Sequence, residues 1–302
     1  MTFSSLSNVC APLSASTLSS ALCGQPATKR KPLTTEPQDE RLDTDGRVCA
    51  WLGSYPAIGL EEIADVAFHD RRDTKFLLSG GQLQKILAAV RPFYRVLEIN
   101  GTRLQAYRTL YFDSDDLDFY MAHHNGKPGR CKVRSRQYLE TGDTFLEVKR
   151  RAPRGRTSKV RLRTPEMVTE IAPSEQAFIA MQTIAHTSPL VRQLENRFKR
   201  ATLVDLCNHE RVTIDVQIEL LDGHRRIGFP NVFVVEVKEG GEQRASPFIE
   251  QLRAMNIHPS SFSKYCVGIA LLRPRAKRNR FKPHLRRLAS MATGGINVDQ
   301  LI

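Results

Sequence analysis

The chain has 302 residues, of which 45 are Lys or Arg and 32 are Asp or Glu, and its formal net charge is +13. Its hydrophobic fraction of 41% and charged fraction of 25% are typical of globular proteins, which excludes a wholly disordered chain. No stretch approaches the roughly 18 uninterrupted apolar residues of a membrane-spanning helix, so the sequence predicts no integral membrane protein. The six cysteines form no CxxC pair, which argues against a zinc ribbon or a disulfide scaffold and favours a reduced, cytoplasmic setting.

The positive charge is concentrated after residue 65. Residues 1–65 are rich in Ser, Thr and Pro and carry five basic and eight acidic residues, so we expect a weakly structured leader of net charge −3. Its more apolar part, residues 51–68, is a candidate to dock on the following domain. The rest of the chain carries +16, and a compact domain of that charge repels itself unless it faces a polyanion. The candidate partners are nucleic acid, an anionic membrane and a phosphate-rich small molecule.

From about residue 70, short alternating runs separated by turn signals predict β-strands. In chain order, these strands are 72–78, 104–112, 130–138, 144–151, 158–164, 196–204, 211–220, 231–238 and 264–272. Loops at 140–144 and 221–225 are typical of antiparallel hairpins. Three further runs, 80–90, 174–185 and 246–255, predict helices, the second with Ser174 as its N-cap.

This pattern predicts an α+β fold rather than a parallel βαβ fold. Eight or nine strands with few helices favour a closed antiparallel β-tunnel of about eight strands with helices packed outside. We expect the tunnel domain to span residues 66–273 and a basic C-terminal tail to span residues 274–302. The segment 271–287 holds eight basic residues and no acidic one. It is compatible with a solvated tail or with binding to an emerging polyanion, an acidic lipid surface or RNA.

Two predicted strands each place three cations on one face, because side chains alternate between the faces of a strand. The two triplets are Lys132, Arg134 and Arg136, and Lys159, Arg161 and Arg163. A solvated face normally mixes charges of both signs, since like charges opposed across strands are destabilising. The triplets therefore favour a cation-lined concavity that holds a polyanion over a merely solvent-facing sheet.

Carboxylates recur among these cations. FLEVK (145–149) and VVEVK (234–238) each place a Glu and a Lys two residues apart on one face. A carboxylate among cations can bind a divalent metal that bridges phosphate oxygens, whereas the alternative is a surface ion pair worth at most about 1 kcal/mol. In the strand 211–220, Asp215 shares a polar face with Arg211, and five apolar residues are predicted to share the opposite, core-facing side.

The cations are separated by Val, Leu and Ser, whereas a nucleic-acid reader more often shows exposed aromatic residues among its basic ones. The sequence also contains neither a Walker A loop nor a GxGxxG motif. If ATP binds, side chains on strands must therefore neutralise its phosphates. ATP and polyphosphate are the favoured partners, and nucleic acid is less favoured.

Eight segments in order between about residues 70 and 272 resemble one known family. They are DTKFLL, YRTLYFD, HHNGKPGRCKVRSR, FLEVKRR, FKRATL, RVTID, VVEVK and SFSKYCVGIALL. The chain thus resembles the polyphosphate polymerase domain of the vacuolar transporter chaperone (VTC) family, in the CYTH-like triphosphate tunnel metalloenzyme superfamily. The resemblance implies a closed β-tunnel that binds nucleotide phosphates and polyphosphate with Mn²⁺ or Mg²⁺. It also implies transfer of the γ-phosphoryl group of ATP to a phosphate chain, with release of ADP.

The resemblance implies roles for individual residues. The phosphate-gripping cations would be Lys75, Arg134, Arg136, Lys149, Arg200, Arg211 and Lys264, with Ser263 beside the last. Glu236 would bind the metal. Lys132, Lys159, Arg161 and Arg163 are predicted to bind substrate from their shared faces, and Glu147 and Asp215 are candidates for a second metal contact. The family's Tyr-Asn-Arg motif reads Phe-Lys-Arg at residues 198–200, which adds a charge.

The leading functional prediction is a metal-dependent polyphosphate polymerase. An inorganic or nucleoside triphosphatase on the same scaffold is an alternative, and so is a non-catalytic module that binds polyphosphate or RNA. Vectorial transport of a product would need a separate membrane partner protein, through which the protein could associate with a membrane, and an acidic membrane surface is a further candidate partner. His123 and His124 precede an Asn-Gly turn signal and are not predicted to bind a metal.

Overall fold

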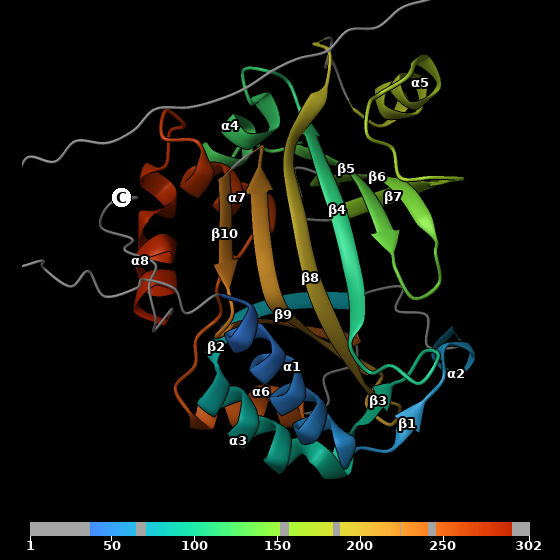
Figure 1. Ribbon diagram of the computed structural model, residues 1–302, viewed down its shortest axis with the longest axis vertical. Coiled ribbons are helices and arrows are strands. Elements are labelled where there is room, and N and C mark those ends of the chain that lie inside the picture. Colours follow the sequence, from blue (N-terminus) through green and yellow to red (C-terminus); the bar gives the residue numbers. More distant parts are fainter. Residues whose placement is uncertain are drawn as a thin grey trace, which may run out of the picture. The chain divides into compact units, whose positions relative to one another are not determined.

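The computed structural model describes residues 37–64, 71–151, 157–183, 188–223, 225–240 and 246–291, and these residues belong to one compact unit. Eight long strands dominate this part of the chain. They are β2 (Arg71–Ser79), β4 (Gln105–Asp113), β5 (Cys131–Tyr138), β6 (Thr144–Arg151), β7 (Thr157–Thr164), β8 (Val191–Asp205), β9 (Glu210–Asp222) and β11 (Val232–Gly240). They are neighbours in the order β2-β11-β9-β8-β4-β5-β6-β7 (Figure 1). Three short strands, β1 (Ala57–Ile58), β3 (Arg95–Leu97) and β10 (Arg225–Phe229), complete an 11-stranded sheet.

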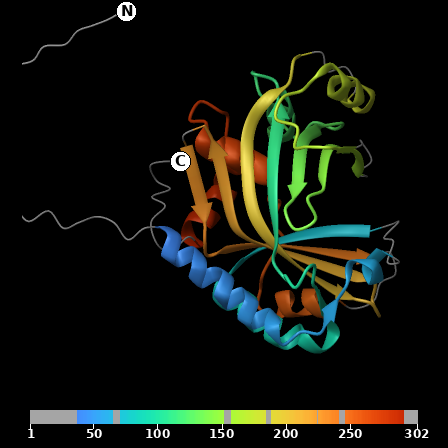
Figure 2. The same ribbon diagram turned by 45° about the vertical axis from the view of Figure 1, so that its right-hand side comes forward.

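The sheet is mostly antiparallel, as predicted, but it is open. Only the short pair of β1 with β3 is parallel among the described strands. β2 and β7 end the eight-strand order and do not pair with each other in the described residues. The predicted closure and the predicted count of about eight strands are therefore wrong, whereas the α+β class is confirmed. The sheet curves strongly: β2 runs across the direction of β4 and β8 (Figure 2), and β2, β5 and β6 line one cavity.

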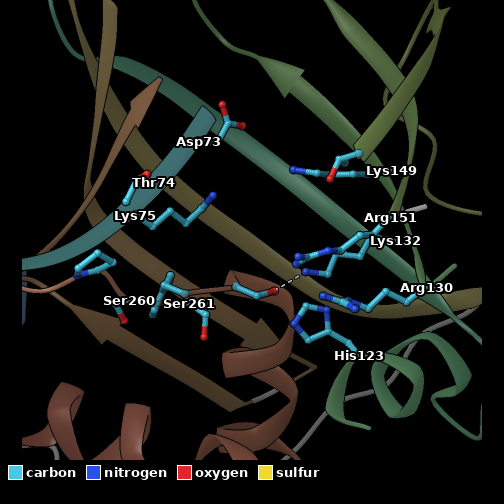
Figure 3. A pocket seen from close by; sticks show the side chains of 14 residues that line it. Asp73, Thr74, Lys75, His123, Arg130, Lys132, Lys149, Arg151, Ser260 and Ser261 are labelled. Atoms are coloured by element: carbon cyan, nitrogen blue, oxygen red, sulfur yellow. Dashed lines mark hydrogen bonds between the residues drawn. The ribbon is translucent and has the colours of Figure 1, made fainter. Parts of the chain in front are cut away.

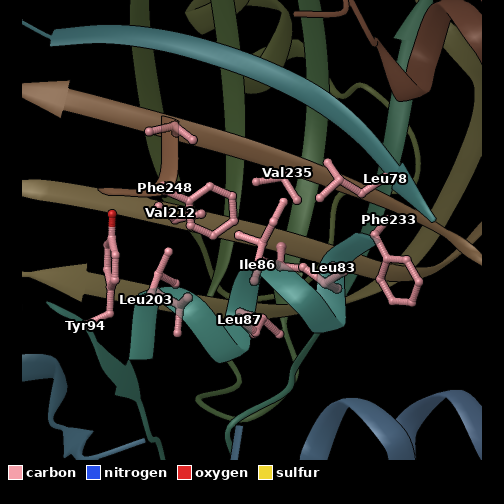
Figure 4. Close-up of a cluster of buried hydrophobic side chains, with 14 of the residues drawn as sticks. Leu78, Leu83, Ile86, Leu87, Tyr94, Leu203, Val212, Phe233, Val235 and Phe248 are labelled. Carbon is pink, nitrogen blue, oxygen red and sulfur yellow. The ribbon is translucent and has the colours of Figure 1, made fainter. Parts of the chain in front are cut away.

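The convex face of the sheet carries the largest hydrophobic core. Helices α1 (Pro37–Gly53), α3 (Gly80–Val90) and α6 (Pro247–Ala254) pack there (Figure 1). α3 inserts Leu83, Ile86 and Leu87 beneath β2, β9 and β11 (Figure 4). The helix begins with a capping box, because Ser79 and Gln82 each accept a hydrogen bond from the other's backbone N–H. The predicted helices at 80–90 and 246–255 are thereby confirmed.

Helix α7 (Lys264–Leu272) lies inside the curve of the sheet and is buried on every side from Tyr265 onward. A Cβ atom at Gly268 would lie 2.4 Å from Leu194 Cδ2, so the helix can approach β8 this closely only with glycine there. The predicted strand at 264–272 is wrong. A short uninterrupted apolar run suits a buried strand and a buried helix equally, and Ser263 caps this helix by accepting from the Cys266 N–H.

A β-bulge makes β9 change faces. Gln217 has a φ of 49°, and the register between β8 and β9 shifts nearby. The apolar residues before the bulge, which face the convex side, are Val212, Ile214 and Val216, and those after it, which face α7, are Ile218 and Leu220. The prediction that all five share one face is wrong, because an extra residue breaks the two-residue period. The polar part of the concave face therefore ends at Asp215 on this strand.

The remaining helices are α2 (Leu60–Ala64), α4 (Asp118–His124), α5 (Pro173–Gln182) and α8 (Lys282–Met291), with 3₁₀ helices η1 (Arg91–Phe93) and η2 (Asn279–Phe281). α5 packs Ile179 with the outward-facing residues of β4, β5 and β6. Its N-cap is Ala172 rather than the predicted Ser174, whose hydroxyl instead donates to Glu175.

The expected domain boundaries differ from the limits of the packed structure. Val48 and Leu52 of α1 are fully buried in the main core, so the leader expected over residues 1–65 is helical from Pro37 and packed from Thr44, and residues 1–36 lie outside the described residues. At the other end, Leu285 and Leu288 of α8 are buried in the core around α7. The expected tail is therefore packed through Met291, and residues 292–302 lie outside the described residues.

Candidate functional site

The concave face holds a polar cavity of about 450 Å³. β2 forms one wall with Asp73, Thr74 and Lys75, and β5 and β6 form the other with Lys132 and Lys149 (Figure 3). The segment before α7 closes one side, held to β2 by a 2.7 Å hydrogen bond from the Ser260 N–H to the Lys75 carbonyl. Lys132 Nζ donates to Ser263 Oγ at 2.8 Å, which joins β5 to the start of α7.

Glu147 of β6 is the first of three carboxylates on this face, each of which binds two cations. Its side chain is 1% exposed. Arg134 donates to Glu147 Oε2 at 2.6 Å from β5, and Lys159 pairs with Oε1 from β7. Burial acts to raise the pKa of Glu147, but Arg134 and Lys159 outweigh burial and lower that pKa to about 2. Glu147 is therefore ionised at neutral pH and neutralises part of the two predicted triplets.

Asp215 of β9 is the second of the three carboxylates. Arg200 of β8 binds it with two parallel hydrogen bonds, of 2.5 Å to Oδ1 and 2.9 Å to Oδ2, and Lys264 of α7 also pairs with Oδ2. Burial again opposes ionisation, but the two cations hold the pKa of this carboxyl below its usual range. The pairing places Arg200 and Lys264, which come from distant parts of the chain, at one point of the concave face.

Glu236 of β11 is the third carboxylate on the concave face. Lys75, directly opposite on β2, binds Oε1, and Lys238 binds Oε2 at 2.9 Å and reaches Asp73 at 3.3 Å. Burial raises and the two lysines lower the pKa of Glu236, and the lysines prevail. Arg211 lies opposite Lys238 in the β9–β11 register, so it shares this face.

Aromatic rings support the guanidinium groups between these carboxylates. Tyr107 and Phe198 stack with ring centroids 4.9 Å apart, and the guanidinium carbons of Arg136 and Arg200 lie 5.2–5.7 Å from the two centroids. Arg136 is 6% exposed and pairs with no carboxylate in the described structure; its side chain donates to Thr109 at 3.2 Å. Lys264 Nζ lies 4.2 Å from the Phe198 centroid. Phe198, which replaces a tyrosine of the family motif, is thus part of the site.

Lys149 pairs with no carboxylate among the described residues. It lies directly opposite Lys132 on β5 and Lys159 on β7, so three lysines follow one another across the sheet. Burial in the cavity first, and then repulsion by Lys75, lower its pKa to about 8. The pKa of Lys159 is also lowered to about 8, by burial first and then by Arg134. Like charges opposed across strands are destabilising, so this arrangement favours a bound anion.

Most of the predicted residues therefore meet at the carboxylates or in the cavity, but not all. Arg161 of the edge strand β7 shares the concave face, because it lies opposite Glu147, but it does not line the cavity and lies over the Phe145 ring at 4.7 Å. Arg163 is 74% exposed and pairs with Asp143 of the hairpin loop at 2.5 Å, away from the cavity. Lys199, the charge added in the altered motif, points to the opposite face and pairs with Asp45 of α1. The added charge is thus not part of the concave face.

Arg130, Arg151 and His123 line the cavity but were not among the predicted site residues. The sequence did indicate the two arginines. Arg130 is two residues before Lys132 and Arg151 is two residues after Lys149, so each lies on the same strand face as its charged neighbour. Nothing comparable marks His123, which reaches the cavity because α4 packs near η2, where Phe281 stacks on its ring.

The described residues do not form a ready-made divalent cation site. No group of three His, Cys, Asp or Glu side chains meets among them. Both carboxylate oxygens of Glu236 are bound by lysines, and Glu147 and Asp215 are equally engaged by their own cations. A resident Mn²⁺ or Mg²⁺, which prefers six oxygen ligands, does not fit this arrangement.

The fold and site define a curved, mostly antiparallel sheet whose concave face is lined with cations. The family model of the VTC domain matches residues 70–273. The chain therefore belongs to the VTC-domain family, and the resemblance recognised in its sequence is confirmed at that level. No curated protein matches the chain.

Three solved structures illustrate how distant the other similarities are. A Vibrio parahaemolyticus protein assigned as an adenylate cyclase shares 11% identity, with a TM-score of 0.38, over 65% of this chain and 97% of its own. A Hippeastrum protein assigned as an adenylyl cyclase, with a dominant triphosphatase activity, shares 16% identity, with a TM-score of 0.38, over 65% of this chain and 93% of its own. The S. pombe RNA triphosphatase Pct1 shares 9% identity, with a TM-score of 0.23, over 89% of this chain and 100% of its own. Similarities at this level carry no functional argument.

None of the helices within the described ranges is both long and apolar enough to cross a membrane.

Proposed function

We propose that this protein is a polyphosphate polymerase that transfers the γ-phosphoryl group of ATP to the end of a polyphosphate chain held on the concave face. The observation that carries the proposal is the charge arrangement on that face. Glu147, Asp215 and Glu236 are each held by two cations, and Arg136, Lys132 and Lys149 pair with no carboxylate among the described residues. Membership of the VTC-domain family supports the same assignment.

Phosphoryl transfer depends mainly on positioning and charge neutralisation, and these side chains supply both. Arg134, Arg136 and Arg200 are planar donors that suit bidentate binding of phosphate oxygens. Each is fixed before substrate arrives, by a carboxylate or by aromatic rings. Incoming phosphates would compete with Glu147 and Asp215 for these cations, so the carboxylates act as internal counter-ions of the empty site. The acceptor is a terminal phosphate that is already anionic, so the reaction requires no dedicated base.

The divalent cation is proposed to arrive as part of the substrate. Mn²⁺ or Mg²⁺ would enter on the phosphates of ATP, which supply oxygen ligands that the protein lacks. In this proposal Glu236 is the residue that contacts the arriving cation, and Lys75 or Lys238 must then release one of its oxygens.

The test is incubation of the purified protein with ATP and Mn²⁺, with polyphosphate resolved on a gel and ADP and orthophosphate measured in parallel. A ladder of polyphosphate matched by ADP supports the polymerase. Orthophosphate without a ladder identifies a triphosphatase, in which water takes the place of the acceptor. Tight polyphosphate binding with neither product identifies a binding module and contradicts the proposed activity.

A further inference from the structure

Two rungs of the β5–β6 ladder place cation opposite cation at one end of the cavity. The Arg151 N–H donates to the Arg130 carbonyl at 3.0 Å, so the backbone pairing continues past the first residue of β5 and sets these two arginines opposite each other. The next pair on the same face of the ladder is Lys132 with Lys149. The pair after that on this face is Arg134 with Glu147, where opposite charges first meet. Cross-strand pairs of like charge are destabilising in an empty sheet.

In the part of the chain that the structure describes, this end of the cavity has no internal counter-ion on its own wall. Among the described residues that line the cavity, Asp73 on the opposite wall is the only carboxylate, and it contacts Lys238 at 3.3 Å. Within the described ranges, the Arg130 side chain donates only to the Lys127 carbonyl, at 3.1 Å. Burial first, and repulsion by Arg151 second, lower the pKa of Arg130. An anion between the two guanidinium groups would relieve both effects.

His123 completes this group of side chains (Figure 3). The last turn of α4 carries it, and Phe281 of η2 stacks on its ring with centroids 6.2 Å apart and an interplanar angle of 26°. Its Nδ1 is buried and has no hydrogen-bond partner in the described part of the chain. Arg130 and Lys132 face it from β5 and Arg151 from β6, while Ser263 precedes α7 and Arg280 of η2 is bound to the backbone carbonyl of His124.

We infer that His123, Arg130 and Arg151 form an end subsite that binds phosphates of a polyphosphate chain beyond those held by the ion-paired interior, and that His123 takes up a proton when this end subsite is filled. The choice of polyphosphate as the ligand of this end subsite rests on the proposed function. It assigns a role to three residues outside the set that grips the reacting phosphates.

The proton uptake follows from the charges around the ring. Burial first, and then Lys132, Arg130 and Arg151, lower the pKa of His123 to about 3, so the empty site holds a neutral imidazole. A phosphate chain neutralises the three cations and adds negative charge beside the ring. Both changes raise the pKa of His123, so binding to this end subsite strengthens as the pH falls toward the pKa of the occupied state.

Calorimetric binding without ATP tests the end subsite, with tripolyphosphate and a sized long-chain polyphosphate at fixed ionic strength. The Arg130→Gln/Arg151→Gln double variant is expected to weaken long-chain binding about tenfold or more and tripolyphosphate binding less than about twofold. Arg91→Gln/Arg95→Gln, which removes two exposed arginines outside the cavity, is the matched control for net charge and is expected to change neither value appreciably.

The outcomes separate the two proposals. Equal losses for both ligands, or the same losses in the control, would overturn the end subsite while leaving the proposed function intact. Wild-type protein that binds neither ligand would overturn both. A long-chain loss in a protein that makes no polymer supports the end subsite and contradicts only the polymerase.

Proton uptake is measured by repeating the long-chain titration at about pH 6 in two buffers of different ionisation enthalpy. Lys149 and Lys159 are already protonated there, since their pKa values are about 8. We expect wild-type protein to take up more protons than His123→Gln with the same ligand, so that any release from the ligand itself cancels. Equal uptake in the two proteins would overturn the role of His123.

Discussion

The interior of the concave face and the end of the cavity beside α4 carry charge in different ways. In the interior, Glu147, Asp215 and Glu236 each bind two cations, so about half of the charge of those cations is neutralised before any ligand arrives. At the other end, Arg130 and Arg151 stand opposite each other, and no carboxylate of the described residues lies on their wall of the cavity. The ion pairs of the interior therefore stabilise the folded protein, whereas the repulsion between the cations at the cavity end destabilises it.

This difference assigns different physical roles to the two regions. Removing one member of a buried ion pair leaves an uncompensated charge, so interior substitutions affect stability as well as binding. Removing an arginine from the cavity end relieves repulsion, so substitutions there affect binding alone. The predictions below test that contrast, beginning with the largest effect.

Asp215→Ala is expected to lower the free energy of unfolding by about 3–5 kcal/mol, because it leaves Arg200 and Lys264 buried without their shared counter-ion. Arg130→Gln serves as the comparison and is expected to change it by less than about 0.5 kcal/mol. Urea denaturation of both variants measures the difference. Similar stabilities would show that the interior ion pairs do not differ in kind from the cations at the cavity end.

Glu236→Gln is expected to lower metal-dependent ADP formation by about 10²–10³-fold, because the neutral amide no longer anchors Lys75 and Lys238 or attracts the cation carried by ATP. The amide keeps the shape of the side chain and an acceptor oxygen, so we expect the fold to be retained, as checked by circular dichroism. Wild-type turnover in this variant would contradict the proposed role of Glu236.

Arg134→Ala is expected to weaken triphosphate binding roughly 10- to 100-fold, because it removes the hydrogen bonds between the guanidinium cation and the phosphate oxygens. Arg163→Ala is the control from the neighbouring triplet, because its side chain is exposed and pairs outside the cavity. Calorimetry with tripolyphosphate measures both. Equal affinities for Arg134→Ala and wild type would mean that the first triplet does not bind the ligand.

The alternation of side chains between the two faces of a strand correctly predicted which residues of β5 and β6 lie on the concave face. The faces of Lys132, Arg134 and Arg136 follow from the two-residue period, and the hairpin between β5 and β6 then sets Arg134 opposite Glu147. The same period, extended by one step at each strand, would have included Arg130 and Arg151.

What sequence patterns could not supply was the arrangement beyond single strands. The bulge at Gln217 follows no period, so the apolar residues of β9 were assigned to one face instead of two. The helical state of residues 264–272 depends on burial on all sides, which an apolar run does not specify. The pairing of Asp215 with Lys264 depends on that helix lying inside the curve of the sheet.

Lys149 and its neighbour Lys159 predict a pH dependence that sharpens the comparison. The lowered pKa of about 8 means that Lys149 is fully charged well below pH 8 and loses its proton as the pH rises through that value. Polyphosphate affinity is therefore expected to fall several-fold between about pH 7 and pH 9 at constant ionic strength. Lys149→Arg, which stays charged, is expected to reduce this fall without abolishing it, because Lys159 titrates in the same range. An identical pH profile for the variant would show that Lys149 does not face the ligand.

The smallest effect is expected at Lys199, where the chain departs from the family motif. Lys199 lies on the convex face and pairs with Asp45 of α1, so it is separated by the sheet from the phosphates that its neighbour Arg200 is proposed to hold. Lys199→Asn, which restores the family residue, is expected to change polyphosphate affinity by less than about twofold and stability by less than about 1 kcal/mol. Calorimetry at fixed ionic strength and urea denaturation measure the two quantities. A large loss of affinity would mean that charge on the convex face contributes to binding, and the contrast between the paired interior and the unpaired cavity end would then no longer account for where polyphosphate binds.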